Sequence, residues 1–398
     1  EVARTRLARI EILPRLSSRY VAEGDAADDA RARDYLELGP TKGETARRLS
    51  ALEAGLRERP SNAPAVGSAL AAAVERIWTN NPGDPLATAL AARLGRPRAR
   101  ERAERVAADP AALLADRLAM IRVLAESPEG PPTAILLPIA TNDPTPSLQL
   151  AALDALSRDD SHAIADALLA AYAQKPGAWQ ARAREAMLGR KSWAGAFLNA
   201  VDRGTIDPKT VPTDALRAVA AHGDETLDAL VRRHWGNVSP GTPEEKLAEV
   251  RRLNNDLRAF PGDARKGRDI FIERCSSCHQ LFGEGKAVGP DLTLANRSDR
   301  DYLLVSLVDP GAVVRKEYQG GVVATRDGRV LTGLITEAGP GTLAITGSTG
   351  ERIEIARAEV ESIRESPVSV MPEDLYRQLS PGDLRDLFAY LQGGPSRP

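Results

Sequence analysis

Both cysteines of this 398-residue chain lie three positions apart, at Cys275 and Cys278, and His279 follows directly. Three kinds of chemistry use such a group: a thiol–disulfide redox pair, a structural zinc site and covalent haem attachment. In the third, the two thiols add to the vinyl groups of haem, and the imidazole of the next residue binds the iron. Each chemistry makes a different demand on the surrounding sequence.

The surrounding sequence disfavours the first two. A thioredoxin-like pair follows a strand at the start of a βαβ unit, whereas residues 263–274 have a helical pattern, with Ile270 and Phe271 leading toward Cys275. A structural zinc ion needs about four ligands. The remaining histidines lie far away in the sequence, at His162, His222 and His234. We therefore predict one covalently bound haem c per chain, with His279 as an iron ligand.

Two later segments supply partners for this histidine and for the iron. Gly289 and Pro290 form a turn soon after His279. Such a turn can present a backbone carbonyl to the second imidazole nitrogen, so Pro290 is expected to orient the ring. Met371 lies in a Met-Pro turn before the closing segment of the chain. A thioether opposite histidine is the ligand pair of c-type cytochromes, so Met371 is the expected second iron ligand. The other methionines, Met120 and Met187, lie in the helical region.

Residues 261–393 resemble a class I cytochrome c. The shared features are a helix that runs into C-x-x-C-H, a G-P-x-L loop, a methionine loop, and a final helix with Ser380 as its cap and Pro381 at its first position. More narrowly, the segments GDARKGRDIFIERCSSCHQLFGEGKAVGPDLT, LLVSLVDPGAVVRKEY, DGRVLTGLI and SVMP are similar to the haem-binding domain of large planctomycete and verrucomicrobial multidomain proteins. The resemblance covers about a third of the chain.

An insertion explains the long separation of the two expected iron ligands. Met371 lies 92 positions after His279, and residues 319–366 between them alternate and turn as strands do. Asp327-Gly328 is a hairpin signal, and about five short strands fit. This pattern resembles Sm-like barrels. Removing these 48 residues leaves 44 positions, which suits a compact cytochrome. We expect a small β-sheet or barrel that either covers a haem edge or docks a redox partner.

The first 255 residues predict a helical scaffold. The outline of residues 147–158 recurs at 178–189, and pairs of short helices of this kind stack to bury their apolar faces. Residues 108–255 resemble HEAT-like repeats followed by a linking helix, whereas residues 1–107 are expected to be helical with irregular spacing. Expected breaks fall at Asp143-Pro144, Lys175-Pro176-Gly177, Asp207-Pro208 and Ser239-Pro240.

The chain as a whole is predicted to be mainly α, with a helical-repeat scaffold followed by a cytochrome c domain at 256–398 that carries the β insertion. Its formal net charge of −2, from 53 basic and 55 acidic residues, gives no reason to expect nucleic acid or an anionic membrane as a partner. No apolar run approaches the roughly 18–20 residues that span a bilayer. No catalytic set is recognisable, and the oligomeric state is not set by the sequence.

Three functions are compatible with these features. The favoured one is electron transfer by a His/Met-ligated haem c, with a redox partner protein. The second is the C-terminal haem portion of a multidomain dehydrogenase. The resembled proteins often carry an N-terminal propeller of the dehydrogenase type. No such propeller is recognisable in this sequence. The missing start methionine fits a chain cut from a longer protein. The third is a haem-based sensor or scaffold. It would be favoured by an iron with a free sixth ligand position, and the presence of Met371 argues against this. A catalyst acting alone is less favoured than an electron carrier.

The attachment chemistry predicts the compartment as well as the cofactor. Thioether formation needs reduced thiols and haem outside the cytoplasmic membrane, so the protein is expected to be periplasmic or otherwise exported. In that oxidising space two free cysteines would tend to form a disulfide, and haem attachment consumes them.

We predict that the exported chain keeps its haem after denaturation and extraction with acidic acetone, because thioether bonds survive this treatment. Mass spectrometry should show one added haem per chain, and Cys275→Ala or Cys278→Ala should deplete the holoprotein. A mass equal to the bare polypeptide, or holoprotein confined to the cytoplasm, would contradict the prediction.

Overall fold

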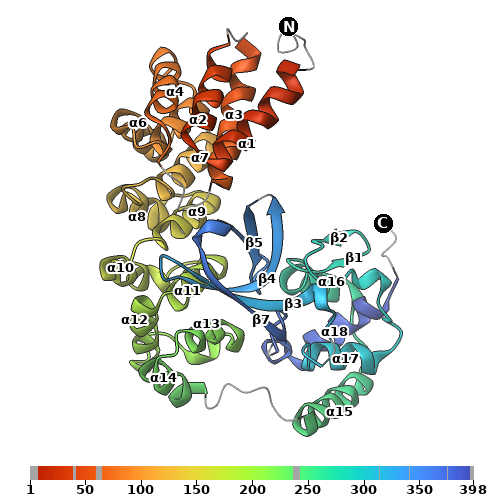
Figure 1. Ribbon diagram of the computed structural model, residues 1–398. Helices are drawn as coiled ribbons and strands as arrows, with labels where there is room; N and C mark the ends of the chain where they lie inside the picture. The colour runs from red at the N-terminus through yellow and green to blue at the C-terminus, as the bar shows by residue number, and fades with distance from the viewer. Residues whose placement is uncertain are drawn as a thin grey trace.

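The computed structural model describes residues 8–38, 42–59, 65–235, 243–312, 314–339, 341–373 and 375–394. It confirms a mainly α fold with a small β unit in the C-terminal third of the chain (Figure 1). The expected break at Ser239-Pro240 lies outside the described residues.

The helical scaffold consists of a short π-helix and the helices α1 to α14. They are the π-helix Ala8–Ile12, α1 Leu13–Glu23, α2 Ala26–Glu37, α3 Lys42–Glu58, α4 Ser68–Asn80, α5 Pro85–Arg93, α6 Pro97–Ala108, α7 Leu114–Ala125, α8 Thr133–Asn142, α9 Pro146–Leu156, α10 His162–Tyr172, α11 Gly177–Leu188, α12 Lys191–Asp202, α13 Leu216–Ala221 and α14 Glu225–Trp235. Short 3₁₀ turns at Pro208–Thr210 and Thr213–Ala215 precede α13. One hydrophobic core joins these helices, from Val21 to Val231.

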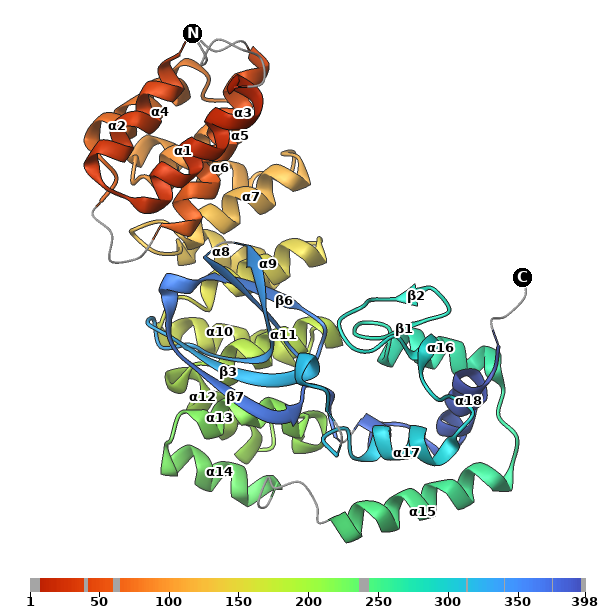
Figure 2. The ribbon, with the colours of Figure 1, turned by 45° about the vertical axis from the view of Figure 1, so that its right-hand side comes forward.

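From α5 onward, the scaffold has two layers. Helices α5, α7, α9, α11 and α13 pack one on the next as an inner layer, and α6, α8, α10, α12 and α14 do the same as an outer layer. Completely buried alanines such as Ala103 and Ala152 let neighbouring helices approach closely. In both views the inner layer faces the β unit (Figures 1 and 2).

A second hydrophobic core holds the C-terminal helices together. These are α15 Pro243–Ala259, α16 Ala264–Arg274, α17 Arg300–Val308 and α18 Pro381–Gln392. The same domain contains a small hairpin of two-residue strands, β1 Gln280–Leu281 and β2 Glu284–Gly285, and 3₁₀ turns at Leu292–Leu294 and Leu375–Gln378. Helix α15, expected as a linker, packs into this core through Val250, Leu253 and Leu257. The expected domain boundary at residue 255 therefore falls inside a helix of the C-terminal core.

The β unit is a five-stranded antiparallel sheet inserted in that second domain. Its strands are β3 Gln319–Thr325, β4 Val330–Gly339, β5 Thr342–Thr346, β6 Arg352–Ala356 and β7 Val360–Ser369, in the order β6-β5-β4-β3-β7. Its own small core contains Val323, Leu343, Ile345 and Ile355. The first residue of β3, Gln319, pairs with the last of β7, Ser369, so the chain leaves the unit where it entered. The unit thus extends three residues beyond the expected end at 366.

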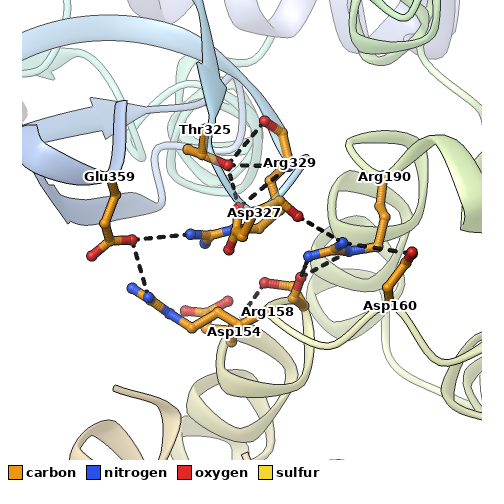
Figure 3. A network of polar contacts seen from close by, with 9 residues as sticks. Asp154, Arg158, Asp160, Arg190, Thr325, Asp327, Arg329 and Glu359 are labelled. Carbon is orange, nitrogen blue, oxygen red and sulfur yellow. Dashed lines mark hydrogen bonds and ion pairs between the residues drawn. The ribbon is translucent and has the colours of Figure 1, made fainter. Parts of the chain in front are cut away.

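Polar contacts fix the β unit to the scaffold (Figure 3). The buried Arg190 donates to the backbone oxygens of Ser157 in the scaffold and Asp327 in the β3–β4 turn, the latter at 3.0 Å. Arg158 forms an ion pair with Glu359 at 3.0 Å, and Glu359 also pairs with Arg329. Because buried polar groups are costly when unpaired, this network favours one docked position of the β unit.

A close helix crossing holds the C-terminal core in shape. Helix α16 packs against α18 at Gly267, where a Cβ atom would overlap the backbone oxygen of Asp386. A glycine is therefore required at this position for the two helices to approach as they do.

We expect Gly267→Ala to destabilise the C-terminal core by about 1–3 kcal/mol, because the added methyl group overpacks the crossing. Urea unfolding followed by haem absorbance should shift to lower urea. Tryptophan fluorescence should shift less, since all four tryptophans lie in the helical scaffold. Gly43→Ala, in a helix with open space around the glycine, should not weaken the protein. Equal transitions for wild type and Gly267→Ala would contradict the packing argument.

Candidate haem-binding site

The Cys-x-x-Cys-His segment continues from helix α16 as two tight turns. Cys275 ends the helix, and its N–H donates to Phe271 O at 2.8 Å. The backbone N–H groups of Cys278 and His279 both donate to Cys275 O, at 3.1 and 2.8 Å. The helix thereby fixes the first cysteine, and the turns present the second cysteine and the histidine at set positions after it.

The next loop folds back on this segment. The N–H groups of Val288 and Gly289 donate to Cys278 O at 3.0 and 2.7 Å. Gly285 has a φ of 98°, and a Cβ there would overlap His279 O, so only glycine fits. At Gly289, a Cβ would lie 2.8 Å from Cε1 of the His279 ring. The absence of side chains at these positions makes room for the imidazole.

The imidazole of His279 is held through one of its two nitrogens. Its Nδ1 lies 2.9 Å from Pro290 O, the carbonyl that was expected from the sequence to orient the ring. A carbonyl accepts only from a protonated nitrogen, so Nδ1 carries the proton and Nε2 carries the lone pair. Burial lowers the pKa of His279, which favours the neutral ring. A neutral imidazole with a lone pair on Nε2 is what an iron ligand requires.

The two thiols lie in apolar surroundings. Burial raises the pKa of the Cys275 thiol to about 12 and also raises that of Cys278. Cys275 packs against the C-terminal core together with Phe282 and Leu292. In the described ranges, no three His, Cys, Asp or Glu side chains come together as a metal site. Two thiols, one imidazole and an apolar core fit a covalently attached haem.

Met371 packs against the same C-terminal core as Cys275, although almost a quarter of the chain separates the two residues. Its N–H donates to Ser369 Oγ at 3.1 Å. Lys246 on α15 links the methionine loop to the end of α17, since its Nζ lies 2.6 Å from Asp309 and 3.3 Å from Glu373. The structure thus places the methionine loop and the attachment segment at one core. Iron ligation by Met371 stays a prediction.

The other histidines lie in the helical scaffold, and two of them, His222 and His234, contact other residues of the scaffold. His222 Nε2 lies 2.8 Å from Leu188 O, and burial lowers the pKa of this histidine. His234 Nε2 lies 2.9 Å from Asp202 Oδ1. These contacts give both histidines packing roles within the scaffold.

Sequence reasoning missed several residues that shape the site. The roles of Gly285 and Gly289 could have been suspected from the glycine-rich segment between the histidine and Pro290. No sequence signal pointed to Lys246, or to Gly350 in the β5–β6 turn, where a Cβ would lie 2.5 Å from Ser277 O of the attachment segment. The neighbouring Thr349 donates to Glu185 of the scaffold at 3.0 Å, so this turn touches both the scaffold and the attachment segment.

Comparisons with known proteins agree with this geometry. Residues 264–328 match the family model for cytochrome c. The chain contains a cytochrome c domain. Among curated proteins, it is similar to a cytochrome c of Arabidopsis thaliana, with 49% identity over 35 residues, and to one of Cochliobolus lunatus, with 53% identity over 32 residues. Each match covers 8% of this chain and 31% or 30% of the relative, so the chain spans about a third of the length of these curated relatives.

A cytochrome c domain implies a covalently bound haem. In the described part of the chain, no helix combines the length and apolar character needed to cross a membrane.

We predict that Gly289→Ala weakens the bond between the iron and His279 by about tenfold or more, because the added methyl group displaces the ring from Pro290 O. The measurement is the high-spin fraction of the oxidised protein by absorbance and paramagnetic resonance, which should rise. Gly311→Ala in the same domain is the matched control, since its nearest neighbours lie 3.8 Å away. Identical spectra for wild type and Gly289→Ala would contradict the assigned role.

Proposed function

We propose that this chain is an electron-transfer protein with one haem c bound through thioethers to Cys275 and Cys278, and with His279 and Met371 as the two iron ligands. The observation that carries the proposal is the 2.9 Å contact from His279 Nδ1 to Pro290 O at the end of the attachment segment. When bound, the haem iron supplies the chemistry, which is the uptake and release of a single electron.

The residues of the chain have three tasks in this proposal. The backbone oxygen of Pro290 accepts a hydrogen bond from Nδ1–H and keeps the ring in the tautomer that leaves Nε2 for iron. The core around Phe271, Phe282 and Leu292 excludes water and keeps the surroundings apolar. The thioether of Met371 favours the reduced iron and therefore a relatively high potential.

We further propose that the helical scaffold is a HEAT-like repeat array that carries and positions this domain. Its stacked inner and outer layers support this interpretation. The electron donor or acceptor would be a separate redox protein or a dehydrogenase domain of the same multidomain polypeptide, as in the planctomycete-type proteins that the sequence resembles. Because haem attachment takes place outside the cytoplasmic membrane, the proposed location is the periplasm or another exported compartment.

We expect Met371→Leu, which conserves side-chain volume, to abolish the weak red absorption band of iron–sulfur ligation. It should lower the reduction potential on the order of 0.1 V within the ~0.8 V range that axial ligands cover. It should also open the reduced iron to carbon monoxide. The controls Met120→Leu and Met187→Leu, both in the scaffold core, should change none of these properties. A wild type without the band, or an unchanged Met371→Leu spectrum, would remove Met371 as the ligand.

A further inference from the structure

A large cavity lies between the helical scaffold, the β unit and the haem-ligand loops. Its volume is about 1450 Å³, larger than the roughly 300–1,000 Å³ of typical small-molecule pockets. The inner-layer helices form one wall and the β unit forms another. Ser277 of the attachment segment and Pro372 beside Met371 also line it. Neither cysteine, nor His279 or Met371, is among the residues that line it.

The cavity wall carries an excess of positive charge. Among the described residues, eleven arginines and six carboxylates line it, a formal excess of five positive charges in a chain whose net charge is −2. The same lining residues include no lysine, no histidine and no aromatic side chain. Such a surface attracts anions.

The arginines follow the order of the inner layer. Each inner helix, or the turn directly after it, contributes at least one: Arg93 of α5, Arg122 of α7, Arg158 after α9, Arg182 of α11 and Arg217 of α13. Neighbouring helices pack about 8–10 Å apart, so arginines recur along the wall from one inner helix to the next. Burial lowers the pKa of Arg93, and the positive charges of Arg122 and Arg158 lower it further.

Several of these arginines already have carboxylate partners. Arg93 pairs with Glu53 and Glu126, and Arg182 pairs with Asp154 and Glu185. Arg158 pairs with Glu359.

Three cavity arginines have no carboxylate partner among the described residues. Arg122 is exposed and has no ion pair, and Arg217 donates to a backbone oxygen, that of Ser369, at 2.9 Å. Arg184 is only 9% exposed, donates to Tyr172 Oη at 3.2 Å, and has an unpartnered Nε. A buried cation without a counter-charge is unfavourable, so an anion that reaches this wall is stabilised.

The shape and lining favour an extended polypeptide as the anion. Apolar residues such as Leu118, Ile121 and Ala151 lie between the arginines. All five residues of the edge strand β6 line the cavity, and β6 pairs on one side only, with β5, in the described residues. An edge strand accepts an extended chain, and concave surfaces of stacked helices bind extended segments. Single-stranded nucleic acid would call for aromatic stacking platforms, which this wall lacks.

We propose that this cavity binds an extended, acidic polypeptide segment whose carboxylates pair with Arg122, Arg184 and Arg217. The segment belongs to a partner protein. Because Ser277 and Pro372 line the cavity, its occupant would contact both haem-ligand loops. The proposal requires no particular iron ligand and stands apart from the proposed electron transfer.

The test uses the haem-loaded chain and a fluorescent twelve-residue peptide of alternating Glu and Ala, with binding measured by anisotropy. The double variant Arg122→Gln/Arg217→Gln should bind about tenfold more weakly, since it loses two charge-assisted contacts. Arg203→Gln, an exposed arginine at the end of the outer helix α12, should bind like the wild type. Unchanged tryptophan fluorescence shows that each variant is folded. If the double variant is not folded, Arg122→Gln alone, at an exposed position, should still weaken binding.

The proposal is overturned by three outcomes. The first is no binding of the Glu-Ala peptide, or equal binding of a Lys-Ala peptide. The second is the same loss of affinity for Arg203→Gln as for the cavity variants. The third is tighter binding of an oligothymidine of equal charge, which would make the cavity a nucleic-acid site.

Discussion

The pairing of β3 with β7 is the constraint on which the rest of the C-terminal domain depends. Gln319 opens the β unit and pairs with Ser369, which closes it. The five strands of the β unit therefore begin and end at neighbouring positions in the structure. Two residues later comes Met371, whose N–H donates to the hydroxyl of Ser369. The last residue of the sheet thus sets where the methionine loop begins.

This return makes a cytochrome core from two distant pieces of chain. The attachment segment arrives at the core on α16, and the methionine loop arrives on the final strand. Lys246 of α15 ties the loop to the end of α17 through Asp309 and Glu373. The two loops therefore meet at one core although the β unit separates them in the sequence. The β unit is free to use its outer surfaces for the scaffold, which it contacts through Arg190, Arg158 and their partners (Figure 3).

The sequence predicts the parts of this protein that depend on local chemistry. The C-x-x-C-H motif, the carbonyl of Pro290 beside His279 and the strand content of the insertion all follow from residues close together in the chain. Packing between distant segments could not be predicted in this way. Arg158 and Glu359 are 201 positions apart, and nothing near either residue indicates the other. The placement of α15 in the C-terminal core likewise depends on apolar contacts made far along the chain.

The central claim is that one methionine and one histidine, brought together by the closed β unit, hold a covalent haem. Nuclear magnetic resonance of the reduced protein with carbon-13 label in its methionine methyl groups tests this directly. The three methionines give three resonances. The account predicts that one methyl resonance is shifted far upfield by the haem ring, while those of Met120 and Met187 keep ordinary positions. Three methyl resonances in the ordinary range would contradict it.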